Sequence, residues 1–287
     1  MCHFSNSDLV AGRGASFSKE DADRIADIFF NKTFQLVIGC GAEPTMYKHL
    51  LHLVDLGRKY RVPFIGIATN GQLLTEEMIK SFVSQSLDEL IVSVHGITAA
   101  TYERFMPPAR FQKLIEVLEM LDSIRQERNS QKPALRINYT VNPDNLKELA
   151  DFFTVFGKFN ISTLQVRPIV DLGSTVYADK DLRPFRTTYD EVTARLGKEC
   201  RERGITFLVN RHDPTYRSRN VSSVALEYVK RNISPQCVWR PDFNWREESY
   251  RDYCRRIRWR RQLLKGIFTP FDNLPTRDTL LTYEVDI

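Results

Sequence analysis

The chain has 287 residues and a formal net charge of +5, with 42% hydrophobic and 27% charged residues. These values are typical of a globular protein and exclude a disordered or fibrous chain. No run of about 18 apolar residues is present, which argues against a membrane-spanning helix. Residues 1–8 lack the basic and apolar regions of a signal peptide. We therefore expect a cytoplasmic protein without a membrane partner.

The cysteines do not form a disulfide pattern. There are five of them, an odd number, and they are widely scattered along the chain. In a reducing compartment this distribution indicates thiols or metal ligands. Cys237 and Cys254 are 17 positions apart, too far for the short spacings of a typical cluster motif, and we interpret them as two unrelated thiols.

The positive charge is concentrated near the C-terminus. Residues 211–270 contain 14 Lys/Arg against 6 Asp/Glu, and the densest stretch is Arg255–Arg261. Aromatic residues among such charges are found in nucleic-acid-binding segments. A charge run is more often the solvated face of a helix, so nucleic acid is the less favoured partner.

Short apolar strands alternate with amphipathic helices over the first 210 residues. The first helix is expected to start at Ser18, and Thr75 caps a later one. This alternation predicts an α/β fold with a parallel sheet and right-handed crossovers. The expected strands are 34–39, 63–68, 87–94, 135–141, 161–168 and 205–209; the expected helices include segments within 18–29, 47–54, 75–83, 111–118, 146–156 and 189–203.

The strand faces favour a barrel over an open sheet covered on both sides. In 135–141 the odd positions are apolar, whereas Arg136, Asn138 and Thr140 share the other face. Strands covered by helices on both faces are apolar on both. One polar face is typical of a full or partial barrel that holds a polar ligand.

Candidate site residues lie near the ends of successive strands. Taken singly, each has a structural alternative: a tight turn for the glycines, a backbone bond for the histidine, and a protein carboxylate as partner for each arginine. Their shared position matters more, because ligands bind at the carboxyl ends of parallel strands. The segments are Gly39-Cys40-Gly41-Ala42-Glu43-Pro44, Ala68-Thr69-Asn70-Gly71, Ser93-Val94-His95-Gly96, Arg136-Ile137-Asn138 and Gln165-Val166-Arg167-Pro168.

In this order the motifs resemble those of the radical S-adenosylmethionine (radical SAM) superfamily. The first is similar to the family's Gly-Gly-Glu-Pro segment, which meets the SAM amino group, and Thr69-Asn70-Gly71 is similar to the Thr-Asn-Gly that ends the next strand. Ser93-Val94-His95-Gly96 is similar to a Ser-x-Asp/His-Gly motif whose serine faces SAM. The SAM-binding residues implied by the resemblance are Gly39, Gly41, Ala42, Glu43, Asn70, Ser93, His95, Asn138 and Arg167.

The cluster loop departs from the family pattern. Members bind three irons of a [4Fe-4S] cluster through a Cys-x3-Cys-x2-Cys loop, and Cys2 resembles its third cysteine. The first two cysteines would precede Met1. The resemblance thus implies a partial (βα)6 barrel lacking its first strand, Cys2 as a metal ligand, and a truncated chain that does not assemble the usual cluster.

For a complete motif, the resemblance implies reductive cleavage of SAM to a 5′-deoxyadenosyl radical that abstracts hydrogen from a substrate. The cofactors are then a [4Fe-4S] cluster and SAM, and the partners are an unknown substrate and an external one-electron reductant. No side chain was identified as a catalytic acid or base. The expected domains are a radical SAM core, 1–210, and a basic C-terminal extension, 211–287.

Two alternatives remain open at this stage. Val37–Gly41 resembles the first glycine motif of a Rossmann-type SAM-dependent methyltransferase, although a third glycine and the acidic residue after the next strand are missing. The other alternative is a non-catalytic SAM-fold remnant or adaptor that binds a partner through its basic tail.

Overall fold

The computed structural model describes residues 16–39, 42–169, 180–209, 231–235, 237–267 and 282–285. The chain forms two compact units. Unit 1 contains residues 1–12 and 69–217, and unit 2 contains residues 13–68 and 218–287. Among the described residues, no helix is long and apolar enough to cross a membrane.

The first part of unit 2 is a βα unit preceded by a helix. Helix α2 begins as predicted, because the Ser18 hydroxyl accepts a hydrogen bond from the Asp21 N–H at 3.1 Å. Strands β1 and β2 pair in parallel. The elements are α2 (Lys19–Phe29), η2 (Phe30–Lys32), β1 (Gln35–Ile38), η3 (Pro44–Met46), α3 (Leu50–Lys59) and β2 (Phe64–Thr69).

The C-terminal part of unit 2 adds strands and helices that the sequence did not predict. Strand β9 pairs in parallel with β1, on the edge opposite β2, and β7 pairs with β9. The Phe29 ring of α2 lies 6.1–6.4 Å from the rings of Trp239, Phe243 and Tyr250. The elements are β7 (Arg231–Ser234), β8 (Cys237–Val238), α11 (Tyr250–Arg256), α12 (Trp259–Ile267) and β9 (Thr282–Val285).

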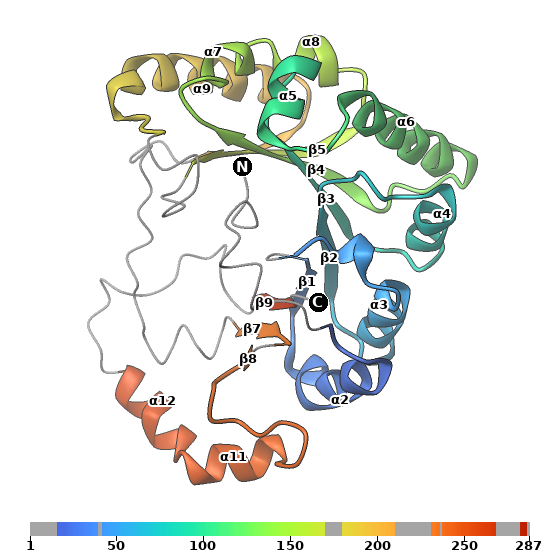
Figure 1. Cartoon of the computed structure of the whole chain (residues 1–287), viewed down its shortest axis with the longest axis vertical. Coiled ribbons are helices and arrows are strands. Elements are labelled where there is room, and N and C mark those ends of the chain that lie inside the picture. The colour runs from blue at the N-terminus through green and yellow to red at the C-terminus, as the bar shows by residue number, and fades with distance from the viewer. Residues whose placement is uncertain are drawn as a thin grey trace. The chain divides into compact units, whose positions relative to one another are not determined.

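Unit 1 is built on four parallel strands that pair in sequence order, β3 to β6. Its described helices lie along one side of these strands (Figure 1). The elements are α4 (Glu76–Ser84), β3 (Glu89–Val94), α5 (Ala99–Phe105), α6 (Phe111–Glu127), β4 (Ala134–Val141), α7 (Leu146–Leu149), α8 (Phe152–Phe156), β5 (Ile161–Pro168), η4 (Arg183–Phe185), α9 (Arg186–Glu202) and β6 (Thr206–Val209).

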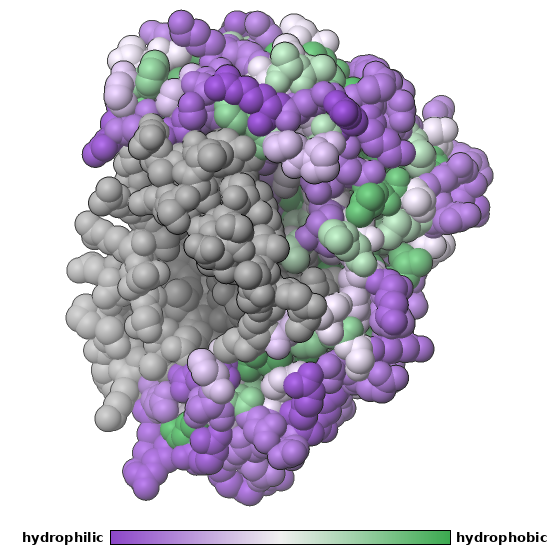
Figure 2. All heavy atoms as spheres, viewed as in Figure 1, coloured by the Kyte–Doolittle hydropathy of each residue, from purple (hydrophilic) through white to green (hydrophobic). Residues whose placement is uncertain are grey.

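The two faces of the unit 1 strands differ as the sequence predicted. Along β4, Leu135, Ile137 and Tyr139 are fully buried, whereas Arg136 and Asn138 are half-buried. The helices turn apolar residues toward the buried face and present a mostly hydrophilic outer surface (Figure 2). The polar face of the strands is therefore the one available to a ligand.

The strand order distinguishes between the two α/β alternatives. All six predicted strands are present and parallel, so the α/β prediction is confirmed. Strand β3 pairs directly with β4, a pair that the Rossmann order 3-2-1-4-5-6 does not contain. Sequential pairing is the pattern of a (βα) barrel.

Two helices differ from expectation: α5 was not predicted, and the expected helix 146–156 is divided into α7 and α8.

Candidate functional site

In unit 2, the candidate segment after β1 begins with a tight turn. Gly39 has φ +94°, and a Cβ at this position would lie 2.5 Å from both the Ala68 carbonyl oxygen and Pro44 Cγ. Only glycine fits this conformation and this approach to the neighbouring strand. Cys40 and Gly41 lie outside the described residues, so the Gly41 prediction stays untested.

The carboxylate of Glu43 is held in place by the helical turn that follows it. Its Oε1 accepts hydrogen bonds from the Thr45 N–H at 3.2 Å and the Thr45 hydroxyl at 2.5 Å. Glu43 and its neighbour Ala42 are both half-buried. A fixed, partly accessible carboxylate suits an ammonium group of a ligand, which is the role that the sequence suggested for Glu43.

In unit 1, the segment after β2 is a hydrogen-bonded turn. The Thr69 hydroxyl accepts from the Gly71 N–H at 2.9 Å, and Asn70 Oδ1 accepts from the Gln72 N–H at 2.9 Å. Gly71 has φ +78°. The turn interpretation of this motif is thus correct, and Asn70 orients the backbone with its side-chain oxygen.

His95, directly after β3, is a buried neutral imidazole with one unpartnered nitrogen. The residue is 7% exposed, and the neighbouring Thr140 backbone favours its protonated form. Nδ1 is buried and has no hydrogen-bond partner among the residues that the structure describes. Burial lowers the pKa of His95 to about 3. Nδ1 is thus an unsatisfied buried polar atom in the described part of the chain, which requires an explanation.

A row of polar side chains runs across β3, β4 and β5, two positions before His95 on β3. Ser93, Asn138 and Gln165 are partners in the registers of β3, β4 and β5, and all three are half-buried. Further along, Thr140 is in register with Arg167, which is exposed. The structure therefore places Ser93, Asn138 and Arg167 on neighbouring strands, as predicted.

Arg136 has protein partners. Its guanidinium donates to Gln165 Oε1 at 2.7 Å and Asn138 Oδ1 at 3.3 Å, and it lies 3.4 Å from Glu89 Oε2. Burial raises the pKa of Glu89, and the charge of Arg136 opposes that rise. The protein carboxylate anticipated as the usual partner is thus present, and Arg136 holds Asn138 and Gln165 in place.

Sequence reasoning missed two residues that brace the end of β3. Asn145 is fully buried, and its Nδ2 donates to the carbonyls of His95 and Thr140 at 2.9 Å each. Glu148 Oε1 accepts from the Ile97 N–H at 2.8 Å. The available signal was Asn142-Pro-Asp-Asn145, an Asn/Asp turn between a strand and a helix.

The metal prediction falls outside the described residues, because Cys2 is not among them. Of the described cysteine side chains, Cys200 is buried and Cys254 half-buried. Burial raises the pKa of the Cys200 thiol to about 11, which suits a structural thiol. Within the described part of the chain, no group of three or more His, Cys, Asp or Glu residues forms a metal site.

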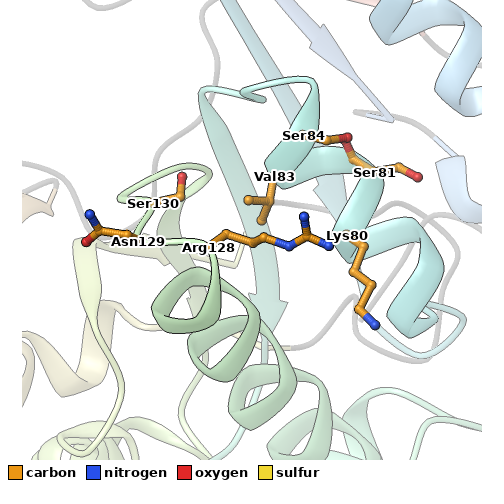
Figure 3. Close-up of a pocket in the computed structure, with 7 residues that line it drawn as sticks. All are labelled: Lys80, Ser81, Val83, Ser84, Arg128, Asn129 and Ser130. Atoms are coloured by element: carbon orange, nitrogen blue, oxygen red, sulfur yellow. The ribbon is translucent and has the colours of Figure 1, made fainter.

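A polar pocket in unit 1 lies away from the candidate residues (Figure 3). It has a volume of about 530 Å³. Its walls come from the second half of α4 and from Arg128–Ser130, which precede β3 and β4 and so lie at the amino ends of the strands. Arg128 is the C-cap residue of α6, where its charge complements the helix dipole, and Lys80 Nζ lies 2.6 Å from Glu76 Oε1.

Each of the two units, taken by itself, has side chains that suit S-adenosylmethionine as a ligand. This ligand carries an ammonium group, hydroxyls and a carboxylate. The chain offers the Glu43 carboxylate, the acceptor nitrogen of His95 and the exposed side chain of Arg167. Glu43 belongs to unit 2, whereas His95 and Arg167 belong to unit 1.

Comparison with known proteins agrees with this interpretation. The model of the "Radical SAM superfamily" matches residues 1–155. A probable GTP 3′,8-cyclase of Saccharolobus islandicus is 24% identical over 198 residues, 68% of this chain and 62% of that protein. A probable GTP 3′,8-cyclase of Sulfolobus acidocaldarius is 21% identical over 235 residues, 82% of this chain and 70% of that protein. The chain thus spans about 62% of the length of the S. islandicus relative.

Solved structures share the fold. Native anSMEcpe with bound AdoMet aligns with a TM-score of 0.52 at 15% identity, covering 75% of this chain and 58% of that one. Streptococcus suis SuiB bound to S-adenosylmethionine aligns with a TM-score of 0.51 at 14% identity, covering 66% and 43%. Enzymes of the superfamily use a [4Fe-4S] cluster together with SAM. Because the family model covers more than half of its residues, the chain belongs to the radical SAM superfamily.

Proposed function

We propose that this protein is a radical SAM enzyme that reductively cleaves SAM, with an external one-electron reductant, and abstracts hydrogen from a substrate not yet identified. The observation that carries the proposal is His95 Nδ1, which is buried at the carboxyl end of a barrel-type strand and has no partner among the described residues. A buried unpartnered acceptor requires an explanation, and a ligand donor supplies one. The polar row of Ser93 and Asn138 on the same face adds further contacts.

Each site residue has a role set by its chemistry. Glu43 accepts from the ammonium group of SAM, and Arg167 binds an anionic group. His95 accepts a hydrogen bond at Nδ1, while Ser93 and Asn138 contact polar groups of the nucleoside. Gly39, Gly41 and Ala42 allow the ligand to approach the backbone, and Asn70 fixes the neighbouring turn.

When bound, the cluster and SAM supply the radical chemistry. The chain's own residues bind and orient the ligand and keep water from it. Cys2 is proposed as a thiolate ligand of the cluster, and no side chain is assigned as a general acid or base. The proposed core is residues 1–210, and residues 211–287 are proposed as a basic extension on which the stability of that core depends.

The proposal is tested by anaerobic reconstitution of this chain and of the chain extended by the upstream codons of its source gene. We expect the extended chain to bind about four irons. After reduction it should convert SAM to 5′-deoxyadenosine, detected by mass spectrometry. Cys2→Ala should abolish both, whereas Cys200→Ala, which removes a buried thiol, should leave both unchanged. A folded extended chain that holds no iron and leaves SAM intact would overturn the proposal.

GTP is the first substrate to test, because the curated relatives are named as probable GTP 3′,8-cyclases. The extended, reconstituted chain is incubated with SAM, a reductant and GTP, and new nucleotide products are sought by mass spectrometry. A GTP-dependent rise in 5′-deoxyadenosine would identify GTP as the substrate. Its absence, with SAM still cleaved, would direct the search to other substrates.

A further inference from the structure

The ends of β3 and β4 are joined by a side chain at the point where their ladder stops. The last register pair of the two strands is Val94 with Tyr139. One position further along, the carbonyls of His95 and Thr140 both accept from Asn145 Nδ2, at 2.9 Å each. The side-chain amide of Asn145 therefore joins the two strands where their backbone hydrogen bonds end.

The orientation of this amide is fixed by its other atom. Asn145 Oδ1 accepts from the Asn142 N–H at 2.7 Å. The reversed orientation would place the amide oxygen against two carbonyl oxygens, which cannot donate to it. Asn145 is fully buried, so water cannot replace these bonds without cost.

Glu148, one turn further along, holds the segment that follows His95. Its Oε1 accepts from the Ile97 N–H at 2.8 Å and from the Tyr139 hydroxyl at 3.2 Å, and its Oε2 lies 3.5 Å from the Thr98 hydroxyl. Gly96, between His95 and Ile97, has no room for a Cβ, because one would lie 2.6 Å from the Tyr102 backbone nitrogen. The segment is thus clamped from two sides.

We propose that Asn145 and Glu148 are positioning residues that hold His95 in a single ring orientation, with Nδ1 presented as a hydrogen-bond acceptor to the ligand. Asn145 donates to the carbonyl of Thr140, whose backbone also lies beside the His95 ring. Loss of Asn145 frees both that carbonyl and the His95 carbonyl, so the backbone that sets the orientation of the ring is no longer held. This inference rests on the proposed function for the identity of the ligand, but not for the state of the ring.

The test uses the full chain labelled with ¹⁵N at histidine. The chain has five histidines, and His95→Gln identifies the signals of His95. In the unaltered protein we expect a single tautomer with the proton on Nε2. We also expect Nδ1 to shift when SAM is added. Asn145→Asp and Glu148→Ala should populate both tautomers and raise the Kd for SAM by roughly tenfold, the effect of losing about one hydrogen bond.

Two further variants separate positioning from stability. Glu148→Gln keeps an acceptor oxygen and should restore the single tautomer that Glu148→Ala loses. Thr193→Val removes a buried hydrogen bond of α9, from Thr193 Oγ1 to the Tyr189 carbonyl at 2.8 Å. It should lower the Tm without altering the His95 signals or the affinity for SAM.

The outcomes separate the two proposals. Unaltered His95 signals in folded Asn145→Asp and Glu148→Ala would overturn the positioning role. If Asn145→Asp does not fold, the pair Glu148→Ala and Glu148→Gln decides alone. A single tautomer that depends on Asn145 or Glu148 but never responds to SAM would support the positioning role and count against the proposed function.

Discussion

Arg136 and Glu89 form an ion pair across β3 and β4, with 3.4 Å between Nη1 and Oε2. Both side chains are largely shielded from water, at 18% and 11% exposure. The pKa of Glu89 is raised, because the cost of burial exceeds the stabilisation that Arg136 provides. The ionised pair therefore lowers the stability of the folded state. In the same pair, Arg136 holds the side chains of Asn138 and Gln165 in place.

The first prediction concerns the pH dependence of this pair. A carboxyl whose pKa is raised by folding binds more protons in the native state, so its contribution to stability falls as the pH rises from about 4.5 through the raised value. Glu89→Gln does not titrate. We expect its free energy of unfolding to improve relative to the unaltered protein over this range, measured by urea denaturation. A difference that moves the other way with pH would contradict the assignment.

His95 gives a pH dependence of the opposite sign. Its pKa is lowered to about 3 in the folded protein, so the unfolded chain binds the extra proton between about pH 6.5 and 3. Stability should therefore fall on acidification, by up to about 1.4 kcal/mol per pH unit. His95→Gln should lack this component. Urea denaturation of both proteins from pH 7 to 4 measures the difference, and parallel curves would refute it.

Gly96 is predicted to be irreplaceable for steric reasons. In Gly96→Ala the new methyl would meet the Tyr102 nitrogen at 2.6 Å, so α5 must move, at a cost of about 1–3 kcal/mol. Gly204→Ala is the matched control, because Gly204 has φ +70° but a methyl group there would meet no atom within 4 Å. Its cost should be limited to backbone strain, about 1 kcal/mol. Thermal unfolding compares the two, and equal losses would rule out the steric explanation.

The contact of α2 with the C-terminal residues makes a prediction about the domain boundary. Phe29 is fully buried against Trp239, Phe243 and Tyr250. Phe29→Ala should cost about 3–5 kcal/mol. Phe34→Ala, at a 59% exposed position, should cost less than about 0.5 kcal/mol. Urea denaturation of the two variants measures both costs, and similar losses would contradict the packing role of Phe29.

A chain ending at residue 210 extends the same test. It would expose the Phe29 side chain, so we expect it to unfold in unit 2 and to bind a hydrophobic dye. A truncated chain as stable as the whole protein would instead show that residues 1–210 fold independently.

Local pattern was enough to predict the strands and most helices, because each βα unit has its own apolar spacing and caps. Ser18 and Thr75 start helices where their hydroxyls indicated. The ends of α7 and α8 and the existence of α5 were not predicted, because short helices carry little periodicity. The strands of the C-terminal part depend on pairing with β1, a long-range contact that no local window contains.

The candidate site likewise contains residues that the local sequence pattern predicted and residues that it did not. Ser93, His95, Asn138 and Arg167 were proposed as site residues because strand alternation and the strand ends point to them, and the strand registers place them on neighbouring strands. Asn145 and Glu148 were missed because their hydrogen bonds join residues about 50 positions apart in sequence. The type of a residue indicates that it can form such a bond, but only the folded structure shows which partner it has.

Unit 2 is discontinuous in sequence, since residues 69–217 separate its two segments. A ribosome adding about 5–20 residues per second spends on the order of 10 s on the intervening stretch. During that time the edge of β1 and the apolar face of α2 have been synthesised without β9 and the aromatic residues that cover them. Apart from residues 1–12, unit 1 is a single stretch of the chain, residues 69–217, and can fold as it is synthesised. In the nascent chain, residues 13–68 therefore stay accessible to chaperones until residues 218–287 have been synthesised.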